Sequence, residues 1–285
     1  MLSYRHAFHA GNHADVLKHF VLMQVLAYMA QKDKPFWYLD SHAGAGMYAL
    51  QHGFAAQNDE YQSGIGKLWR QTDLPSELAN YVNFIKTLNR PSNPKQAELN
   101  NYPGSPICAK ALLREQDRMR LFELHPNDFT LLKKQFSQHK QVMCELRDGF
   151  GGLKALLPPV CRRAVVLIDP PYEVKQDYQK VVQIMHDCIA RFATCTYLIW
   201  YPLLPRREPM HMLQQLHELG AESWLNVSLQ IQHADPSGFG MYGSGLFVVN
   251  PPWTLPSILE NVMPYLTDKL AVDDGAQYIL EHHIT

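Results

Sequence analysis

The sequence lacks an excess of charge of either sign. Its 26 lysine and arginine residues stand against 27 aspartate and glutamate residues, which gives a net charge of −1 at pH 7. A protein that holds nucleic acid or an anionic membrane through its overall field needs a large positive charge. Binding of an anionic partner through the overall charge of the protein is therefore excluded, and any basic contact with such a partner has to be local.

Cysteine is scarce and scattered. The five cysteines form no C-x-x-C pair and no Cys/His spacing of the kind that binds a metal. An odd number of separated cysteines is typical of free thiols in a reducing compartment. We therefore expect no disulfide framework and a location in the cytoplasm.

Long hydrophobic runs are also missing. A membrane-spanning helix needs about 20 consecutive apolar residues, and the most apolar stretch, residues 19–30, is interrupted by Gln24 and preceded by Asp15. No A-x-A site follows it, so a signal peptide is not indicated either. We expect this stretch to be an amphipathic core helix, and we expect no membrane partner.

The sequence contains no internal repeat and no low-complexity segment. Its 285 residues are 46% hydrophobic and 19% charged, which is the composition of a globular protein with a sizeable core. Disordered, collagen-like and coiled-coil proteins are excluded. The length suits one large α/β domain or two small ones.

Helix signals surround the apolar stretch near the amino terminus. Asn12 is a candidate N-cap, and Asp15 places an acidic side chain in the first turn. We predict a helix from about His13 to Gln31. The apolar residues that recur there at helical spacing are Val16, Phe20, Met23 and Ala27.

Short apolar runs alternate with helical patterns along the rest of the chain. A buried strand is expected over 36–40, and helical patterns separate the next four candidates, which is the rhythm of βαβ units in a parallel sheet. Only a glycine-rich stretch separates the last two candidates, so we expect a hairpin that closes the sheet with an antiparallel edge strand. The further strand candidates are Met119–Leu124, Val142–Leu146, Ala164–Ile168, Thr196–Tyr201, Trp224–Ile231 and Leu246–Asn250.

Residues from about 51 to 104 differ in amino-acid composition from the rest of the chain. They are rich in Gln, Asn, Ser and Pro and contain one clear helix, with Pro75 at its start. We predict a small helical insertion, followed by a helix from Ser105 to about Glu115 with Ser105 as its N-cap. The basic residues of the insertion form either a local basic face or an ordinary solvated surface. They are Lys67, Arg70, Lys86 and Arg90.

A glycine-rich segment follows the first strand. Residues 40–46 read DSHAGAG, and residues 44–49 formally match the G-x-G-x-x-A dinucleotide fingerprint. Glycines there suit a tight strand-to-helix turn and a close approach of backbone to ligand. A nicotinamide-binding domain would also carry an acidic residue about 20 residues later, and the polar insertion occupies that region instead. The match alone is therefore weak evidence for binding of a nicotinamide dinucleotide.

Acidic residues follow the next two strand candidates. Glu123 ends a strand, where a carboxylate accepts hydrogen bonds from the ribose hydroxyls of an adenosine ligand. Asp148 follows another, where it either accepts from an adenine amino group or forms a local Asx turn. Both positions suit S-adenosylmethionine as well as NAD.

The segment Asp169–Tyr172 reads DPPY at the end of a strand candidate. The two prolines have no N–H groups, so the carbonyl of Pro170 is free to accept. Asp169 supplies a second acceptor, and the ring of Tyr172 supplies a stacking face. An exocyclic amino group on that ring can donate one hydrogen to each acceptor, which directs its nitrogen lone pair toward an incoming methyl group.

At these residues the chain resembles a known family. DPPY resembles the signature of adenine-N6 methyltransferases that use S-adenosylmethionine. Together with the opening YRHAFHAGNHADVLKH at 4–19 and the LDSHAGAG segment at 39–46, it resembles the ribosomal RNA large subunit methyltransferase J family, whose members methylate N6 of an adenine in 23S rRNA. The resemblance extends over nearly the whole chain, insertion included.

The resemblance implies a Rossmann-like methyltransferase domain over 1–285, with the insertion at about 51–104. It also implies S-adenosylmethionine as cofactor, catalysis by Asp169, Pro170 and Tyr172, and RNA contacts by Tyr4, His6 and Tyr172. The free N-terminal amides of the helix after Asn12 suit the methionine carboxylate of the cofactor. The cofactor-binding residues that the resemblance implies are Lys18, His19, His42, Ser105, Glu123, Asp148, Gly149 and Asp169.

Several readings remain open beside this one. A DNA adenine-N6 methyltransferase shares DPPY, a nicotinamide-dependent oxidoreductase would use the glycine loop, and a non-catalytic RNA-binding protein could share the fold. The 14 histidines could suggest a metal site, but they lack acidic or cysteine partners at ligand spacing, and methyl transfer needs no metal. We expect no metal, naked or early-assembly 23S rRNA as the partner, and a monomer.

Overall fold

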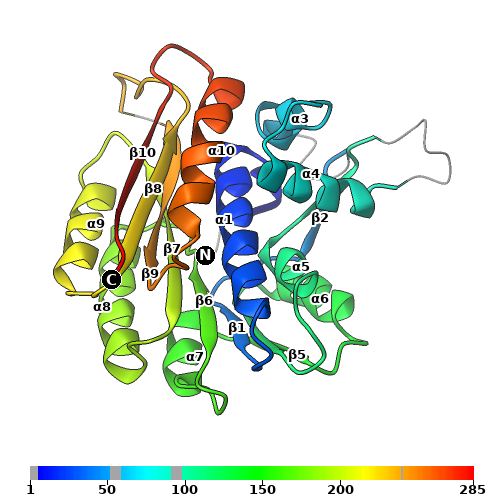
Figure 1. Cartoon of the computed structure of the whole chain (residues 1–285), viewed down its shortest axis with the longest axis vertical. Helices are drawn as coiled ribbons and strands as arrows, with labels where there is room; N and C mark the ends of the chain where they lie inside the picture. The colour runs from blue at the N-terminus through cyan, green and yellow to red at the C-terminus, as the bar shows by residue number, and fades with distance from the viewer. Residues whose placement is uncertain (1–5, 52–58, 91–97, 239) are drawn as a thin grey trace.

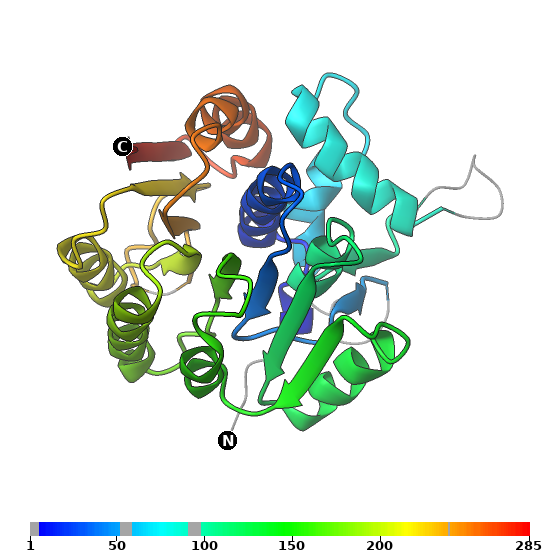
Figure 2. The same cartoon turned by 60° about the horizontal axis from the view of Figure 1, so that its bottom comes forward.

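A sheet of eight strands lies between helices on its two faces (Figures 1 and 2). The computed structural model describes residues 6–51, 59–90, 98–238 and 240–285. The strands are β1 (Trp37–Asp40), β2 (Met47–Ala49), β3 (Asn101–Pro103), β4 (Arg118–Glu123), β5 (Val142–Leu146), β6 (Ala164–Ile168), β7 (Thr196–Leu203), β8 (Trp224–Gln230), β9 (Gly243–Val249) and β10 (Gln277–His283). The helices are η1 (His6–Phe8), α1 (His13–Ala30), η2 (Glu60–Ser63), α3 (Ile65–Leu68), α4 (Ser76–Leu88), α5 (Ser105–Lys110), α6 (Pro126–Gln135), α7 (Gly149–Leu156), α8 (Lys175–Arg191), α9 (Glu208–Glu218) and α10 (Leu255–Leu270).

The sheet has the order β10-β8-β9-β7-β6-β1-β4-β5. The five strands from β7 to β5 in that order are parallel. The predicted α/β class with a mostly parallel, Rossmann-like sheet is confirmed. The carboxyl ends of these strands meet at one edge of the sheet, which is where ligands bind in open α/β folds.

Both faces of the central strands are buried. In β6, Val165 and Leu167 join the core that contains α1 and α10, while Val166 and Ile168 join the core that contains α8 and α9. Successive side chains of a strand point to opposite faces. A strand covered on both faces therefore needs a continuous apolar run, which is why Ala164–Ile168 was recognisable in the sequence.

The antiparallel part of the sheet differs from the prediction. β8 and β9 form the expected antiparallel hairpin, but β9 lies between β7 and β8 rather than at the edge. The edge strand is β10, which pairs antiparallel with β8 and was not predicted. The expectation that the hairpin closes the sheet is wrong, because β9 pairs with the free edge of β7.

The segment between β2 and β3 holds α3 and α4. β2 and β3 pair as a short antiparallel ribbon at its base. The buried face of α4, which includes Tyr81, packs toward α1 and α10 (Figure 1). The helix after β3 is shorter than predicted: α5 ends at Lys110, and its N-cap is Gly104 rather than Ser105.

Helix α1 forms at the predicted place and ends one residue earlier. The Asn12 side chain accepts hydrogen bonds from the N–H groups of Ala14 and Asp15 at 3.0 and 3.1 Å, so Asn12 is the predicted N-cap. The helix is buried from His13 to Leu22 and packs against β7, β9, α5 and α10. None of the helices in the described ranges is long and apolar enough to cross a membrane. The five cysteines are free thiols, as predicted.

Candidate functional site

The carboxyl ends of the parallel strands surround a cavity of about 340 Å³, which we call the first cavity. Its walls come from the segments after β1, β4, β5 and β6 and from the buried face of α1. All eight residues that the sequence analysis assigned to cofactor binding lie on these walls. They are Lys18, His19, His42, Ser105, Glu123, Asp148, Gly149 and Asp169.

Glu123, at the end of β4, is held by backbone donors. Its Oε2 accepts from the N–H of Gly44 at 2.7 Å, and its Oε1 accepts from the N–H of His125 at 2.7 Å. Gly44 has φ +61°, a conformation that glycine adopts without strain. Burial raises the pKa of Glu123, while the two backbone donors oppose that effect. Each oxygen retains a second acceptor position, so the fixed carboxylate can accept hydrogen bonds from two vicinal hydroxyl groups.

We expect Glu123→Ala to weaken binding of S-adenosylhomocysteine by roughly 10- to 100-fold. This range corresponds to the loss of charge-assisted hydrogen bonds worth about 1.5–3 kcal/mol. Isothermal titration measures the effect, and Glu115→Ala, which changes an exposed carboxylate outside the cavity, is the matched control. Equal affinity of the Glu123→Ala variant and the unmodified protein would show that this carboxylate does not contact the cofactor.

The turn after β5 brings Asp148 and Gly149 against the first strand. A Cβ atom on Gly149 would lie 2.0 Å from the carbonyl oxygen of Ser41, so only glycine permits this approach. Asp148 caps α7 by accepting from the N–H of Gly151 at 3.0 Å. The local turn chemistry that the sequence left open is therefore present, and the exposed carboxylate still lies on the wall of the cavity.

His42 lies on the same side of the first cavity as Phe150. The two rings meet edge to face at a centroid distance of 5.1 Å, and the Nδ1 atom of His42 lies 2.8 Å from the hydroxyl of Ser41. Burial lowers the pKa of His42 to about 4. His42 is therefore neutral at pH 7, which suits contact with an uncharged part of a ligand.

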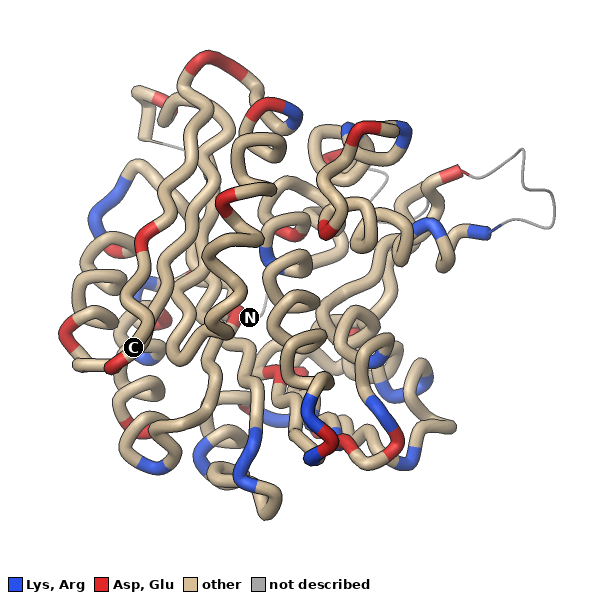
Figure 3. The backbone as a smooth tube through the Cα atoms, viewed as in Figure 1, with Lys and Arg blue, Asp and Glu red and all other residues tan. Residues whose placement is uncertain are grey.

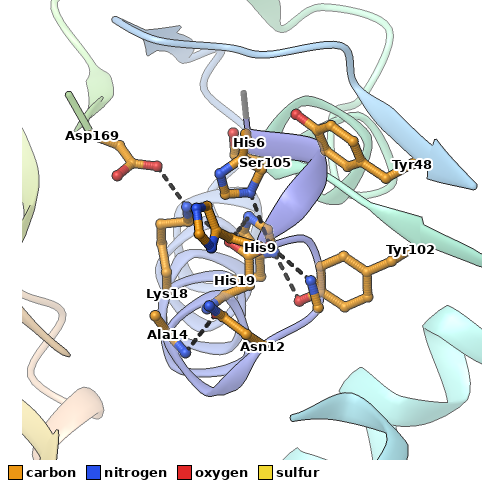
Figure 4. A network of polar contacts seen from close by, with 12 residues as sticks. His6, His9, Asn12, Ala14, Lys18, His19, Tyr48, Tyr102, Ser105 and Asp169 are labelled. Carbon is orange, nitrogen blue, oxygen red and sulfur yellow. Dashed lines mark hydrogen bonds and ion pairs between the residues drawn. The ribbon is translucent and has the colours of Figure 1, made fainter. Parts of the chain in front are cut away.

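Lys18 joins α1 to the DPPY segment. Its Nζ atom lies 2.5 Å from Asp169 Oδ2 (Figure 4). The same atom lies 2.9 Å from Asp15 Oδ1. Burial alone would lower the pKa of Lys18, but the two carboxylates outweigh it and raise that pKa. Burial raises the pKa of Asp169, and Lys18 opposes that rise. The ammonium group thus holds Asp169 in place and opposes the effect of burial on the pKa of its carboxyl.

His19 and Ser105 are bonded to other buried side chains. His19 Nδ1 lies 3.0 Å from the hydroxyl of Tyr102 (Figure 4), and burial lowers the pKa of His19 to about 3. Ser105 donates its hydroxyl to Asp40 Oδ2 at 2.7 Å. The hydroxyl of Tyr38 donates to the same oxygen at 2.7 Å. Both site residues are therefore fixed in orientation before any ligand binds.

Two N-terminal amides of α1 are not free for an anionic ligand group, contrary to the expectation from the sequence. The N–H groups of Ala14 and Asp15 already bond to Asn12, and the N–H of Gly11 donates to Asp15 Oδ2 at 3.0 Å. That expectation is wrong for the amides of Ala14 and Asp15, because the side chain of the N-cap residue Asn12 accepts from both.

A second cavity, of about 210 Å³, lies beside the first. It is bounded by the start of α1, by Pro171 and Tyr172, and by the end of β7 with Trp200 and Pro202. Asp169, Lys18, His6 and Pro171 line both cavities. The carboxylate of Asp169 therefore lies on the wall where the two cavities meet.

Tyr172 lines the second cavity only and is almost completely buried, with 3% of its surface exposed. Its backbone has φ +49°, which costs a non-glycine residue about 1–3 kcal/mol. Its hydroxyl donates to the carbonyl of Trp200 at 2.7 Å, and its ring stacks on Tyr178 at 4.5 Å. These contacts hold the strained residue, and they leave one face of the ring covered by Tyr178. Pro170 lines the first cavity.

The histidines near the amino terminus bond to protein groups. His6 Nε2 lies 3.0 Å from Asp15 Oδ2, and His9 Nδ1 lies 2.9 Å from Glu60 Oε1. Tyr4, the other residue assigned to RNA contact, lies outside the described residues. Among the described residues, one group of potential metal ligands occurs outside both cavities, at the exposed side chains of His233, Asp273 and Asp274.

Three residues that shape the site are not predicted from the sequence. Asp15 has the pattern of a helix-start residue, but it is buried against Lys18 and His6. Asp40, at the end of β1, anchors Ser105, and burial raises its pKa to about 6. Its place at a strand end was a usable signal. Trp200 lies on β7 with its ring 5.7 Å from Lys18 Nζ, and no sequence pattern marked it.

Comparison with known proteins gives consistent matches over nearly the whole chain. The model of the RsmJ family, described as “Ribosomal RNA large subunit methyltransferase D, RlmJ”, matches residues 33–281. Two curated proteins, both named “Ribosomal RNA large subunit methyltransferase J”, are similar. The one from Escherichia coli is 48% identical over 95% of this chain and 94% of its own length. The one from Haemophilus influenzae is 46% identical over 99% and 98%. A crystal structure of a Legionella pneumophila protein superposes with a TM-score of 0.88 at 36% identity, covering 96% of this chain and 98% of that one.

Proposed function

The chain belongs to the ribosomal RNA large subunit methyltransferase J family, and from this premise we propose how its two cavities divide the reaction between them. The chain is an rRNA adenine methyltransferase that uses S-adenosylmethionine and acts on N6 of an adenine in 23S rRNA. In our proposal the first cavity holds the cofactor, and the second cavity holds the target adenine.

The position of Asp169 carries this proposal. Its carboxylate lies on the wall shared by the two cavities, and Lys18 holds it at 2.5 Å. A group that accepts a hydrogen bond from N6 has to lie next to both the adenine and the methyl donor. Asp169 meets that requirement, whereas Glu123 and Asp148 line the first cavity only.

The first cavity fits an adenosyl ligand. Glu123 has acceptor positions for the two ribose hydroxyls, and Asp148 lies beyond the next strand end, where it can accept from the adenine amino group. Neutral His42 and Gly149 complete that side. Lys18, His19 and Ser105 would face the methionine part. When bound, the cofactor supplies an electrophilic methyl group on its sulfonium.

The second cavity would receive an adenine flipped out of the RNA, as enzymes that modify a base require. Asp169 would accept one N6 hydrogen at the wall that the two cavities share. Pro170 lines the first cavity, so its carbonyl would accept the other hydrogen where the cavities meet, and Tyr172 would support the base from the second cavity. Asp169 would take the proton that N6 loses on methylation. His6, on the wall of both cavities, and Tyr4 would contact the RNA near the target base.

The alternative readings are less well supported. The glycine loop does not lead into a helix, because β2 follows at Met47, so the helix N-terminus that binds a dinucleotide pyrophosphate is missing there. The expected strand-to-helix turn at this loop is therefore wrong, and the nicotinamide reading loses its basis. A DNA substrate and a non-catalytic RNA-binding role find no support in the family. A monomer that acts in the cytoplasm on naked or early-assembly 23S rRNA, without a metal, completes our proposal.

We expect S-adenosylhomocysteine to raise the melting temperature and NAD to leave it unchanged. A ligand at 100 times its Kd stabilises the folded state by about 2.7 kcal/mol. Differential scanning fluorimetry with both ligands measures the effect, and adenosine is a useful control for partial occupancy. Stabilisation by NAD alone would overturn the assignment of the first cavity.

A further inference from the structure

The net charge of the protein is close to zero, so it does not indicate which residues bind the phosphates of the RNA backbone. Figure 3 shows acidic and basic residues spread over the molecule without one large field of either sign. A flipped nucleotide in the second cavity leaves its flanking phosphates at the rim, and phosphates are held by cations. The question is therefore which cations lie at that rim.

Lys18, the described cation near the start of α1, is already engaged, and Arg5 lies outside the described residues. Lys18 is buried and paired with Asp15 and Asp169, and Lys32 and Lys34 lie past the other end of α1, about 20 Å along the helix from Lys18. In the insertion, Lys67 donates to the carbonyl of Ala271. These residues do not supply a free charge beside the second cavity.

Arg206 does lie there. It follows β7, is exposed, and lines the second cavity together with Pro202 and Leu204. Its side chain forms no ion pair with any of the described residues. Arg206 helps lower the pKa of Glu208, yet Glu208 forms its ion pair with Lys175. The guanidinium is therefore available to an outside anion.

The loop that carries Arg206 is short and shaped by proline. Pro205 precedes Arg206, and Pro209 lies in the first turn of α9. The N–H of Arg206 donates to the carbonyl of Leu204 at 2.7 Å, and Arg207, also exposed, is the N-cap residue of α9. Figure 3 shows this basic segment between β7 and α9. The two adjacent arginines therefore stand on a constrained backbone, and a guanidinium matches the geometry of a phosphate.

We propose that Arg206, supported by Arg207, binds a phosphate next to the target adenosine and so sets the RNA in register with the second cavity. A guanidinium suits this task because it donates two parallel hydrogen bonds to one phosphate. This inference rests on the proposed function, since it takes the second cavity as the site of the target base. It assigns binding of the RNA phosphate backbone to the loop between β7 and α9 and not to the insertion.

The test compares binding of a 23S rRNA fragment that contains the target adenosine to the full-length protein over a range of salt concentrations. Arg206→Ala is expected to raise the Kd about tenfold and to make the slope of log K against log salt shallower by about 1. Binding of S-adenosylhomocysteine should not change. Arg191→Ala, at the exposed end of α8, is the matched control, and Arg70→Ala tests the insertion.

A neutral methylphosphonate linkage beside the target adenosine sharpens the test. The unmodified protein should lose affinity for this RNA by about as much as Arg206→Ala loses for the normal RNA, while the variant should bind both RNAs equally, because the two changes remove one contact. Arg206→Ala with unchanged Kd and slope, or an equal loss in Arg191→Ala or a loss in Arg70→Ala alone, would overturn the inference. Methylation of the fragment by the unmodified protein is measured in parallel. If it occurs, these outcomes overturn only the role of Arg206; if it does not occur, the proposed function itself is overturned.

Discussion

Asp169→Ala is expected to lower kcat for methylation of the rRNA fragment by about 10²–10⁴-fold, the range for removing a positioned acid–base or electrostatic group. The variant loses the acceptor that orients N6 and takes its proton. Lys18 retains Asp15 as a partner at 2.9 Å, so the fold should survive. Single-turnover kinetics with saturating cofactor measures the effect.

The pH profile adds an independent check. Burial raises the pKa of Asp169 above its usual 3.8, against the opposing effect of Lys18. Activity of the unmodified protein should therefore fall on the acidic side with an apparent pKa above 3.8, as the carboxylate becomes protonated. Asp187→Ala, which changes a carboxylate on α8 outside both cavities, should retain normal turnover. Near-normal turnover of Asp169→Ala would show that this residue is not the acceptor.

Lys18→Met is expected to lower the free energy of unfolding at pH 7 by about 3–5 kcal/mol. It leaves the buried Asp15 and the partly buried Asp169 without their shared counterion. Burial would raise the pKa of Asp15, but His6 and Lys18 outweigh it and hold that pKa well below its usual value. Urea unfolding measures the loss. Lys180→Met, which removes a half-exposed partner of Asp177, should cost less than about 1 kcal/mol.

The loss of unfolding free energy in Lys18→Met should depend on pH if it comes from lost ion pairs, and it should not if it comes from a packing defect. In the unmodified protein, the lowered pKa of Asp15 contributes stability above the usual carboxyl pKa of 3.8, and this is lost as the pH falls further. The raised pKa of Lys18 contributes stability below 10.5, which is lost only at higher pH. Without Lys18, Asp15 and Asp169 should take up a proton more readily, so the deficit should shrink from pH 7 to about pH 5. A deficit that stays constant over that range would contradict the assigned ion pairs of Lys18 with Asp15 and Asp169.

The parallel part of the sheet could be predicted because burial on both faces leaves a clear mark in sequence. β5 and β6 have the predicted bounds, and β4 and β7 differ only at their ends. β10 leaves no such mark, since all but one of its residues are exposed. The place of β9 beside β7 depends on which strand edge remains free after folding, and a local pattern does not encode that.

The first cavity could be predicted for a related reason. Parallel strands bring their carboxyl ends to one edge, so residues after β1, β4, β5 and β6 were expected to meet, and Glu123, Asp148 and Asp169 do line one cavity. The contact of Lys18 with Asp169 joins residues 151 positions apart, and only the packing of α1 on the sheet creates it. Arg206 could not be singled out in the sequence, because it is distinguished by its position at the second cavity and by forming no ion pair with the described residues.

Mapping of N6-methyladenine in 23S rRNA by mass spectrometry measures the product of the proposed reaction in the cell. RNA from cells that lack this protein is compared with RNA from the same cells supplied with the unmodified protein or with Asp169→Ala. We expect one N6-methyladenine that is absent without the protein, restored by the unmodified protein and not restored by the variant. An unchanged map in cells that lack the protein would contradict this expectation.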